Sequence, residues 1–220
     1  MNSFDLKIVG IISMLIDHIG FVFWDKSILR IIGRIAFPIF AFQSVIGYEH
    51  TNNKKKHLLK IFLFGVISQA SYYLMNDAVN QFAKLNIMFT ILLGLASISA
   101  FNKFKKKFDG FLAVSFVCFL GIILRVDYGW FGILLIFFFY YFKNNKRKMV
   151  LAICLLFTLR YILNIVYIDT IYYLKVLLSS CLSLILICLY NKKEGIKTKY
   201  LFYVFYPLHM LVIYLIYIIL

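Results

Sequence analysis

Residues 4–24 read FDLKIVGIISMLIDHIGFVFW, an apolar run that is long enough to cross a bilayer as one helix. Similar runs fill nearly all of the 220 residues, and 63% of the chain is hydrophobic. Lipid offers no hydrogen bonds to an exposed backbone, and these runs do not alternate as barrel strands do, so each is predicted to be a helix. We therefore expect an all-α fold, a polytopic transmembrane helix bundle that occupies residues 1–220 as a single domain.

About nine spans are predicted from the lengths of the apolar runs. In order along the chain they lie at residues 4–24, 28–48, 58–75, 85–101, 111–125, 129–142, 149–168, 172–190 and 200–220. The fifth and sixth are short for a full crossing, which leaves the number of spans between residues 111 and 142 open.

Basic residues mark alternate loops between these spans. Four lysines or arginines fall in each of the loops at 54–60, 103–107, 143–148 and 192–199. Because loops of this kind stay in the cytoplasm, the N-terminus is predicted to be cytoplasmic and the C-terminus outside, in a multi-pass protein of the inner (cytoplasmic) membrane. The same loops explain the net charge of +15 without a nucleic-acid partner. The four cysteines lie within apolar runs and lack metal-ligand spacing, so no metal is expected.

Asp17 and His18 stand side by side in the first span. A charge at the centre of a membrane helix costs about 2.5–3.5 kcal/mol on insertion scales, so an ionisable residue kept there is by default a functional candidate. Adjacent helix positions point about 100° apart, so the two side chains serve different neighbours. The functional interpretation makes His18 a general base or acid. The alternative is a structural ion pair, for instance between Asp17 and Arg34.

Arg34 lies four residues before Pro38 in the second span. Proline cannot donate a hydrogen bond to the carbonyl of residue 34, so a kink is predicted at that point. Freed backbone beside a guanidinium is a plausible place to bind a carbonyl or an anionic group. The other interpretation is a packing kink in which Arg34 neutralises Asp17.

The rise of about 1.5 Å per helix residue places polar residues of several spans at one depth. These residues, in the outer half of the membrane, are Asp17, His18, Arg34, Asn86, Thr90, Asp127 and Arg160, with His209 near mid-depth beneath them. Polar groups in lipid must satisfy one another or line a wet cavity. We therefore predict a polar cavity that opens toward the outer leaflet and has its floor near His209.

Two further pairs share a helix face. Asn86 and Thr90 are four residues apart, and they fit either hydrogen bonds to a substrate oxyanion or polar contacts between helices. Tyr206 and His209 are three apart beside Pro207, which fits either catalysis or a hydrogen-bonded structural histidine.

At the predicted cytoplasmic face, His50, Lys54 and Lys55 are candidates for holding the phosphates of a nucleotide-bearing substrate. The other interpretation of these charges is a signal for topology alone.

Five stretches of the chain resemble the TraX family of integral-membrane proteins. They are residues 14–20 (MLIDHIG), 31–42 (IIGRIAFPIFAF), 86–94, 127–130 (DYGW) and 206–209 (YPLH), and they follow the family's order from end to end. The family's named member N-acetylates the amino terminus of conjugative pilin. The resemblance thus implies a membrane acyltransferase that uses cytoplasmic acetyl-CoA as acyl donor, while the acceptor need not be pilin.

The resemblance and the predicted depth together suggest roles for the residues named above. His18 would be the base, with Asp17, Arg34 and His209 as further catalytic candidates, and Asn86, Thr90, Tyr206, Asp127, Arg160, His50, Lys54 and Lys55 as candidates for binding substrate or acetyl-CoA. The expected acceptor is an amine or hydroxyl at the outer half of the membrane, on a pilin-like peptide, a surface glycan or a lipid. The alternative function is a transporter or flippase for a small anion or a lipid-linked substrate, although the chain shows no repeated halves.

Overall fold

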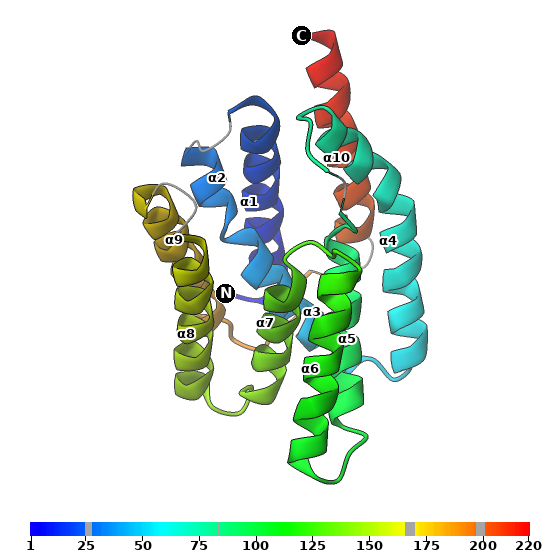
Figure 1. Cartoon of the computed structure of the whole chain (residues 1–220), viewed down its shortest axis with the longest axis vertical. Coiled ribbons are helices and arrows are strands. Elements are labelled where there is room, and N and C mark those ends of the chain that lie inside the picture. Colours follow the sequence, from blue (N-terminus) through cyan, green and yellow to red (C-terminus); the bar gives the residue numbers. More distant parts are fainter. Residues whose placement is uncertain (25–27, 83, 166–169, 197–200) are drawn as a thin grey trace.

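The structure, a computed structural model, describes residues 1–24, 28–82, 84–165, 170–196 and 201–220 (Figure 1). The described residues form ten helical segments. These are α1 (Ser3–Phe23), α2 (Ile28–Gly33), α3 (Ala36–His50), α4 (Lys54–Asp77), α5 (Ile87–Phe101), α6 (Lys107–Ile123), α7 (Gly129–Tyr141), α8 (Lys146–Ile165), α9 (Thr170–Cys188) and α10 (Leu201–Ile219). No strand occurs in these ranges, so the predicted all-α fold is confirmed.

The predicted number of about nine helices is also confirmed within the described chain, because α2 and α3 follow one another in a single candidate span, Ile28–His50. Five helices are long and apolar enough to cross a membrane by themselves: α1, the α2–α3 unit, α4, most of α9 and α10. The shorter α5 and α7 are also apolar. The chain is therefore a membrane protein. The end of the predicted seventh span (166–168), the first residue of the ninth (200) and part of the last basic loop (197–199) lie outside the described residues.

The basic loops meet at one end of the bundle. Lys143, after α7, forms an ion pair with Glu49 at the end of α3, and the Lys146 ammonium donates to the Cys188 carbonyl, 3.0 Å away, at the end of α9. The N-terminal ammonium donates to the Leu189 carbonyl at the same end, over 3.0 Å. The α5–α6 and α7–α8 turns both lie in the lower part of Figure 1, away from the C-terminus at the top. The side of the membrane that this end faces remains a prediction.

A break in the second crossing shapes the site. Helix α2 ends at Gly33 and α3 begins at Ala36, while the amides of Arg34 and Ile35 donate to carbonyls only three residues back, over 3.2 Å each. Pro38 then occupies the first turn of α3, where its missing N–H leaves no helical bond unmade. The predicted kink at Arg34 is therefore confirmed, and it puts this side chain at a bend between α1, α7 and α9.

Candidate functional site

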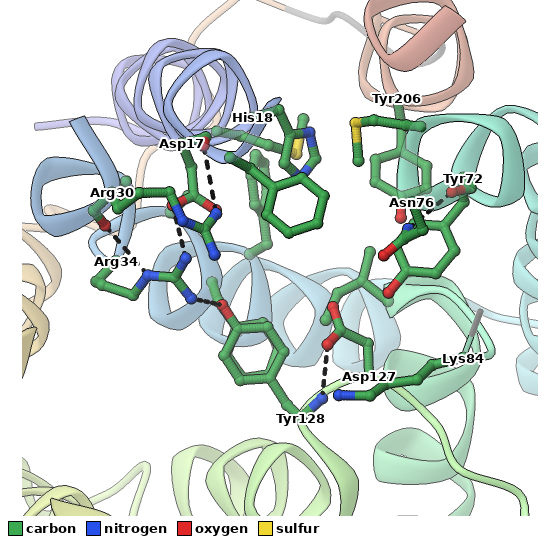
Figure 2. Close-up of a pocket in the computed structure, with 18 of the residues that line it drawn as sticks. Asp17, His18, Arg30, Arg34, Tyr72, Asn76, Lys84, Asp127, Tyr128 and Tyr206 are labelled. Atoms are coloured by element: carbon green, nitrogen blue, oxygen red, sulfur yellow. Dashed lines mark hydrogen bonds and ion pairs between the residues drawn. The ribbon is translucent and has the colours of Figure 1, made fainter. Parts of the chain in front are cut away.

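A polar cavity of about 370 Å³ lies between α1, the α2–α3 break, α4, α10 and the loops before α5 and α7 (Figure 2). Its charged and hydrogen-bonding walls come from Asp17, His18, Arg30, Arg34, Tyr72, Asn76, Gln81, Lys84, Asp127, Tyr128, Arg160, Tyr173 and Tyr206. Five of the residues predicted at one depth thus line one cavity, although they come from separate parts of the chain. We call it the polar cavity.

Asp17 is the centre of a partly buried charge cluster. One carboxylate oxygen lies 2.7 Å from Arg34 Nη2 and the other 2.9 Å from Arg30 Nη1. Arg30 also donates to the Asp17 carbonyl at 3.3 Å, and Arg34 Nε donates to the Arg30 carbonyl at 3.1 Å. The predicted pair of Asp17 with Arg34 is present, but the carboxylate serves two arginines rather than one. We call these three residues the arginine cluster.

Gly33 allows α1 and α2 to come this close. A Cβ atom at this position would overlap the Asp17 side chain. The small residue directly before Arg34 is therefore part of how the arginine cluster is assembled.

Tyr128 continues the cluster toward α7. Arg34 Nη1 donates to its hydroxyl at 3.3 Å, Phe37 stacks on its ring at 3.9 Å between centroids, and the Arg160 guanidinium lies 5.4 Å from the ring centroid. Tyr128 has φ +60°, a left-handed conformation that is uncommon for a bulky residue. Such backbone conformations gather at functional sites, where the surroundings hold them in place.

The neighbouring Asp127 is fixed by its backbone. Its amide donates to the Leu85 carbonyl at 2.8 Å, Leu85 N–H donates to the Arg125 carbonyl at 3.2 Å, and the Thr90 hydroxyl donates to the Asp127 carbonyl. The carboxyl lies in the turn outside the membrane-spanning helices, where burial raises its pKa while the positive charge of Lys84 opposes the rise. The carboxylate accepts a hydrogen bond from the Tyr128 amide over 3.0 Å (Figure 2).

His18 and His209 form a hydrogen-bonded pair across 191 residues of sequence. His18 Nδ1 lies 2.6 Å from His209 Nε2, and His209 Nδ1 lies 2.7 Å from the Phe205 carbonyl. A carbonyl oxygen only accepts, so His209 Nδ1 carries a proton, and neutral His209 accepts from His18 through Nε2. On this assignment, made from the hydrogen-bond network, His18 carries its own proton on Nδ1 and leaves the Nε2 lone pair available.

The two histidines face different spaces. His18 lines the polar cavity. His209 instead lines an apolar groove of about 540 Å³ between α1 and α10, with Leu15, Ile19 and Phe205 among its walls. The predicted floor near His209 is therefore revised: His209 does not line the polar cavity itself, and it contacts two residues that do, His18 and Tyr206.

Tyr206, which is predicted to bind substrate, lines the polar cavity. The residue is only 1% exposed.

Asn86 and Thr90 do not line the polar cavity. Asn86 caps α5, accepting from Met88 N–H at 3.0 Å, and donates to the Gly65 carbonyl at 2.7 Å. Both are fully buried, so the structure places them as contacts between helices and loops, which was the alternative interpretation.

His50, Lys54 and Lys55 lie apart from the polar cavity. All three are exposed at the end of the bundle where the basic loops meet. His50 Nδ1 contacts its own helix at the Ile46 carbonyl, 2.8 Å away. Their predicted role in holding phosphates stays a prediction.

Sequence reasoning missed Arg30, Tyr128, Tyr72 and Asn76 as members of the site. Arg30 had a readable signal, because it lies four residues before Arg34 on the same helix face. Tyr72 and Asn76 are likewise four apart, and Asn76 donates to the Tyr72 carbonyl at 2.7 Å. The left-handed backbone conformation that orients Tyr128 cannot be recognised from the sequence pattern.

Comparison with known proteins places this architecture among related chains. A family model described as TraX protein matches residues 3–217. A probable fimbrial assembly protein FimC, serogroup H1, of Dichelobacter nodosus is 33% identical over 111 residues, which cover 44% of this chain and 45% of that protein. An uncharacterized protein of Rickettsia prowazekii (strain Madrid E) is 36% identical over 129 residues, 56% of this chain and 49% of that protein. The matched parts thus span about half the length of these curated relatives. No solved structure matches the chain.

Proposed function

The chain belongs to the TraX family, and on that premise we propose that it is an integral-membrane acyltransferase. It moves an acetyl group from cytoplasmic acetyl-CoA to an amine or hydroxyl presented at the outer half of the membrane. The observation that carries this proposal is the His18–His209 pair, because it leaves one basic nitrogen of His18 at the wall of the polar cavity.

His18 acts as the general base. As the acceptor nitrogen or oxygen forms its bond to the acyl carbon, its proton passes to His18 Nε2, and the positive charge that results is shared with His209 through the hydrogen bond. The Phe205 carbonyl holds His209 in the tautomer that can receive the His18 Nδ1–H. When the carbon–sulfur bond breaks, His18 returns the same proton to the leaving sulfur, so protons balance over the cycle.

Arg34 and Tyr206 are the proposed donors for the negative charge that develops on the acyl oxygen. Both line the polar cavity with His18. Donors that are already in place and shielded from water are usually the largest electrostatic contribution to such a reaction. Asp17 holds Arg34 at 2.7 Å and is a positioning residue.

Acetyl-CoA supplies the activated thioester. A cavity of 370 Å³ is at the lower end of the range for ligand pockets, so it fits the reacting groups while the nucleotide stays outside. His50, Lys54 and Lys55, exposed among the basic loops, have the charge to hold the phosphates of that nucleotide.

The acceptor we propose is a pilin-like membrane protein. This rests on family membership and on the likeness to a probable fimbrial assembly protein of Dichelobacter nodosus. A surface glycan or a lipid is the other acceptor class to be tested, with the protein in the cytoplasmic membrane in each case.

Purified protein in detergent with labelled acetyl-CoA tests the proposal. Label should pass to a peptide with a free amino terminus or to an isolated surface glycan, and His18→Ala should reduce the rate by about 10²–10⁴-fold. His57→Ala is the matched control, because His57 lies outside the polar cavity. Full activity of His18→Ala would show that His18 is not the general base. If the wild-type protein transfers label to none of the acceptors, the proposed acyltransferase activity is wrong.

Transport is the second candidate, favoured by the arginines that line the polar cavity. In proteoliposomes it would show as movement of an unmodified anion across the membrane. Movement without acetyl transfer would favour the transporter over the acyltransferase.

A further inference from the structure

A second, smaller cavity lies behind the arginine cluster. It measures about 190 Å³ and is lined by residues of the α2–α3 break, α7, α8 and α9. Arg30, Arg34, Tyr128 and Arg160 belong to both cavities and form the partition between them. We call the smaller space the arginine cavity. Liquid water takes about 30 Å³ per molecule, so the space holds a small polyatomic ion but no nucleotide.

The charged side chains around the arginine cavity are all positive among the described residues. Three arginines line it, and no aspartate or glutamate does so among the described residues. Asp17, which lines only the polar cavity, is shared by Arg30 and Arg34. Two guanidiniums with one carboxylate leave an excess positive charge in a membrane-spanning region, where uncompensated charge is expensive.

Arg30 also has a donor that this arrangement leaves unused. Its Nε is buried and has no hydrogen-bond partner among the described residues. A buried donor without a partner is rare and calls for an explanation, and an absent ion is one such explanation. The Arg30 and Arg34 side chains keep 16% and 20% of their surface accessible, so a ligand can reach them.

Other donors approach the arginine cavity from different elements. Tyr161 comes from α8, and Tyr172 and Tyr173 come from α9. The Ser180 hydroxyl, also at this wall, already donates to the Val176 carbonyl over 2.9 Å. A planar carboxylate presents two oxygens in one plane, whereas a tetrahedral phosphate presents oxygens toward α2, α8 and α9 together. Guanidinium groups also match phosphate with two parallel hydrogen bonds.

We propose that the arginine cavity binds a phosphate group. The phosphate belongs either to a soluble phosphate or to the headgroup of an anionic phospholipid, since both present the same oxygens. This inference goes beyond the acyltransferase proposal and does not depend on it, because the site is defined by charge and donors rather than by the reaction at His18.

The test is thermal stability of the purified full chain in a maltoside detergent, which carries no phosphate. One arm adds inorganic phosphate and the other adds phosphatidylglycerol, each against sodium chloride at equal ionic strength. A ligand that binds only the folded state raises Tm in a saturable way. We expect a saturable rise in Tm in one arm, and that arm identifies the source of the phosphate group. In Arg30→Gln the apparent affinity for this ligand should be lower by at least about tenfold, as expected for the loss of hydrogen bonds to a charged group.

Arg125→Gln is the matched control, because Arg125 is exposed and lines neither cavity. If Arg30→Gln does not fold, Arg30→Lys serves instead, because it keeps a charge for Asp17 and removes the Nε donor. No stabilisation beyond chloride in either arm would overturn the proposal, as would equal weakening by Arg30→Gln and Arg125→Gln. Neither result depends on whether acetyl transfer is observed.

Discussion

Asp17 and His18 are adjacent on α1, yet the two side chains differ in how completely their polar atoms are used. On the Asp17 side, both carboxylate oxygens are engaged by Arg30 and Arg34, and the backbone carbonyl accepts a third bond. On the His18 side, one ring nitrogen is bonded to His209 and the other is left to the cavity. A carboxylate with both oxygens engaged holds helices together, whereas a ring nitrogen without a partner among the described residues is available for chemistry.

This contrast explains why a costly acid and a costly base occur together. The arginine cluster fixes α1 against the α2–α3 break, and the helix that it fixes carries His18 to the cavity wall. Changes on the Asp17 side should therefore act mainly on stability, and changes on the His18 side mainly on rate.

The largest effect is expected from Asp17→Asn. This change leaves two partly buried guanidiniums without their counter-ion, and breaking a buried pair by removing one partner costs about 3–5 kcal/mol. Thermal unfolding in detergent measures the loss. Asp77→Asn, at the exposed end of α4, is the control and should leave Tm unchanged. If Asp17→Asn unfolds at the wild-type temperature, the arginine cluster does not hold the bundle.

Gly33→Ala tests the same region through packing alone. The added methyl group overlaps the Asp17 side chain, so α1 and α2 must separate, and overpacking of this kind costs about 1–3 kcal/mol. Gly47→Ala in α3 is the control, because the nearest side-chain atom to its added Cβ is 3.9 Å away. It should be neutral or slightly stabilising, since alanine is the better helix former. Equal Tm values for the two variants would show that the close approach at Gly33 is not required.

Substitutions around His18 should lower the rate of acetyl transfer. His209→Leu removes the acceptor for His18 Nδ1, and we expect the rate to fall by about 10–100-fold, the loss found when the hydrogen-bond partners of metal-binding histidines are removed. His209→Asn should recover part of the rate, because its amide oxygen can accept the same bond. Initial rates at saturating acetyl-CoA, with Tm measured alongside, separate this from a structural role. Equal rates for the two variants would indicate that His209 only packs.

The two regions also differ in how far the sequence predicts them. Apolar runs predict the helices because lipid leaves the backbone no other partner, and Pro38 predicts the break at Arg34 because proline cannot donate a hydrogen bond. The pair of Asp17 with Arg34 follows from depth alone, because it needs only two opposite charges in one layer of lipid.

The His18 side depends on features that one sequence does not contain. The contact with His209 joins the first and last helices, and only the packing of α1 against α10 creates it. Asn86 and Thr90 show the converse, since polar residues at the right depth serve as a cap and a loop anchor instead of lining the cavity. Depth therefore identifies which polar residues share a layer, and packing decides which of them face the cavity.

Tyr128→Phe probes the outer edge of the arginine cluster, where the smallest effect is expected. The change removes the hydroxyl that accepts from Arg34 at 3.3 Å but keeps the ring beneath Arg160 and against Phe37. Arg34 retains Asp17, so the loss should be about 0.5–1.5 kcal/mol, the net value of one hydrogen bond. Thermal unfolding against Tyr214→Phe, a tyrosine that lines neither cavity, measures it.

A loss as large as that of Asp17→Asn would place Tyr128 inside the arginine cluster and not at its edge. The boundary between the two regions would then lie beyond Arg34, and Arg34 would be too tightly held to turn toward a reacting oxygen. A small loss of stability with a larger loss of acetyl transfer would support the opposite arrangement, in which Tyr128 tunes an arginine that remains available to the polar cavity.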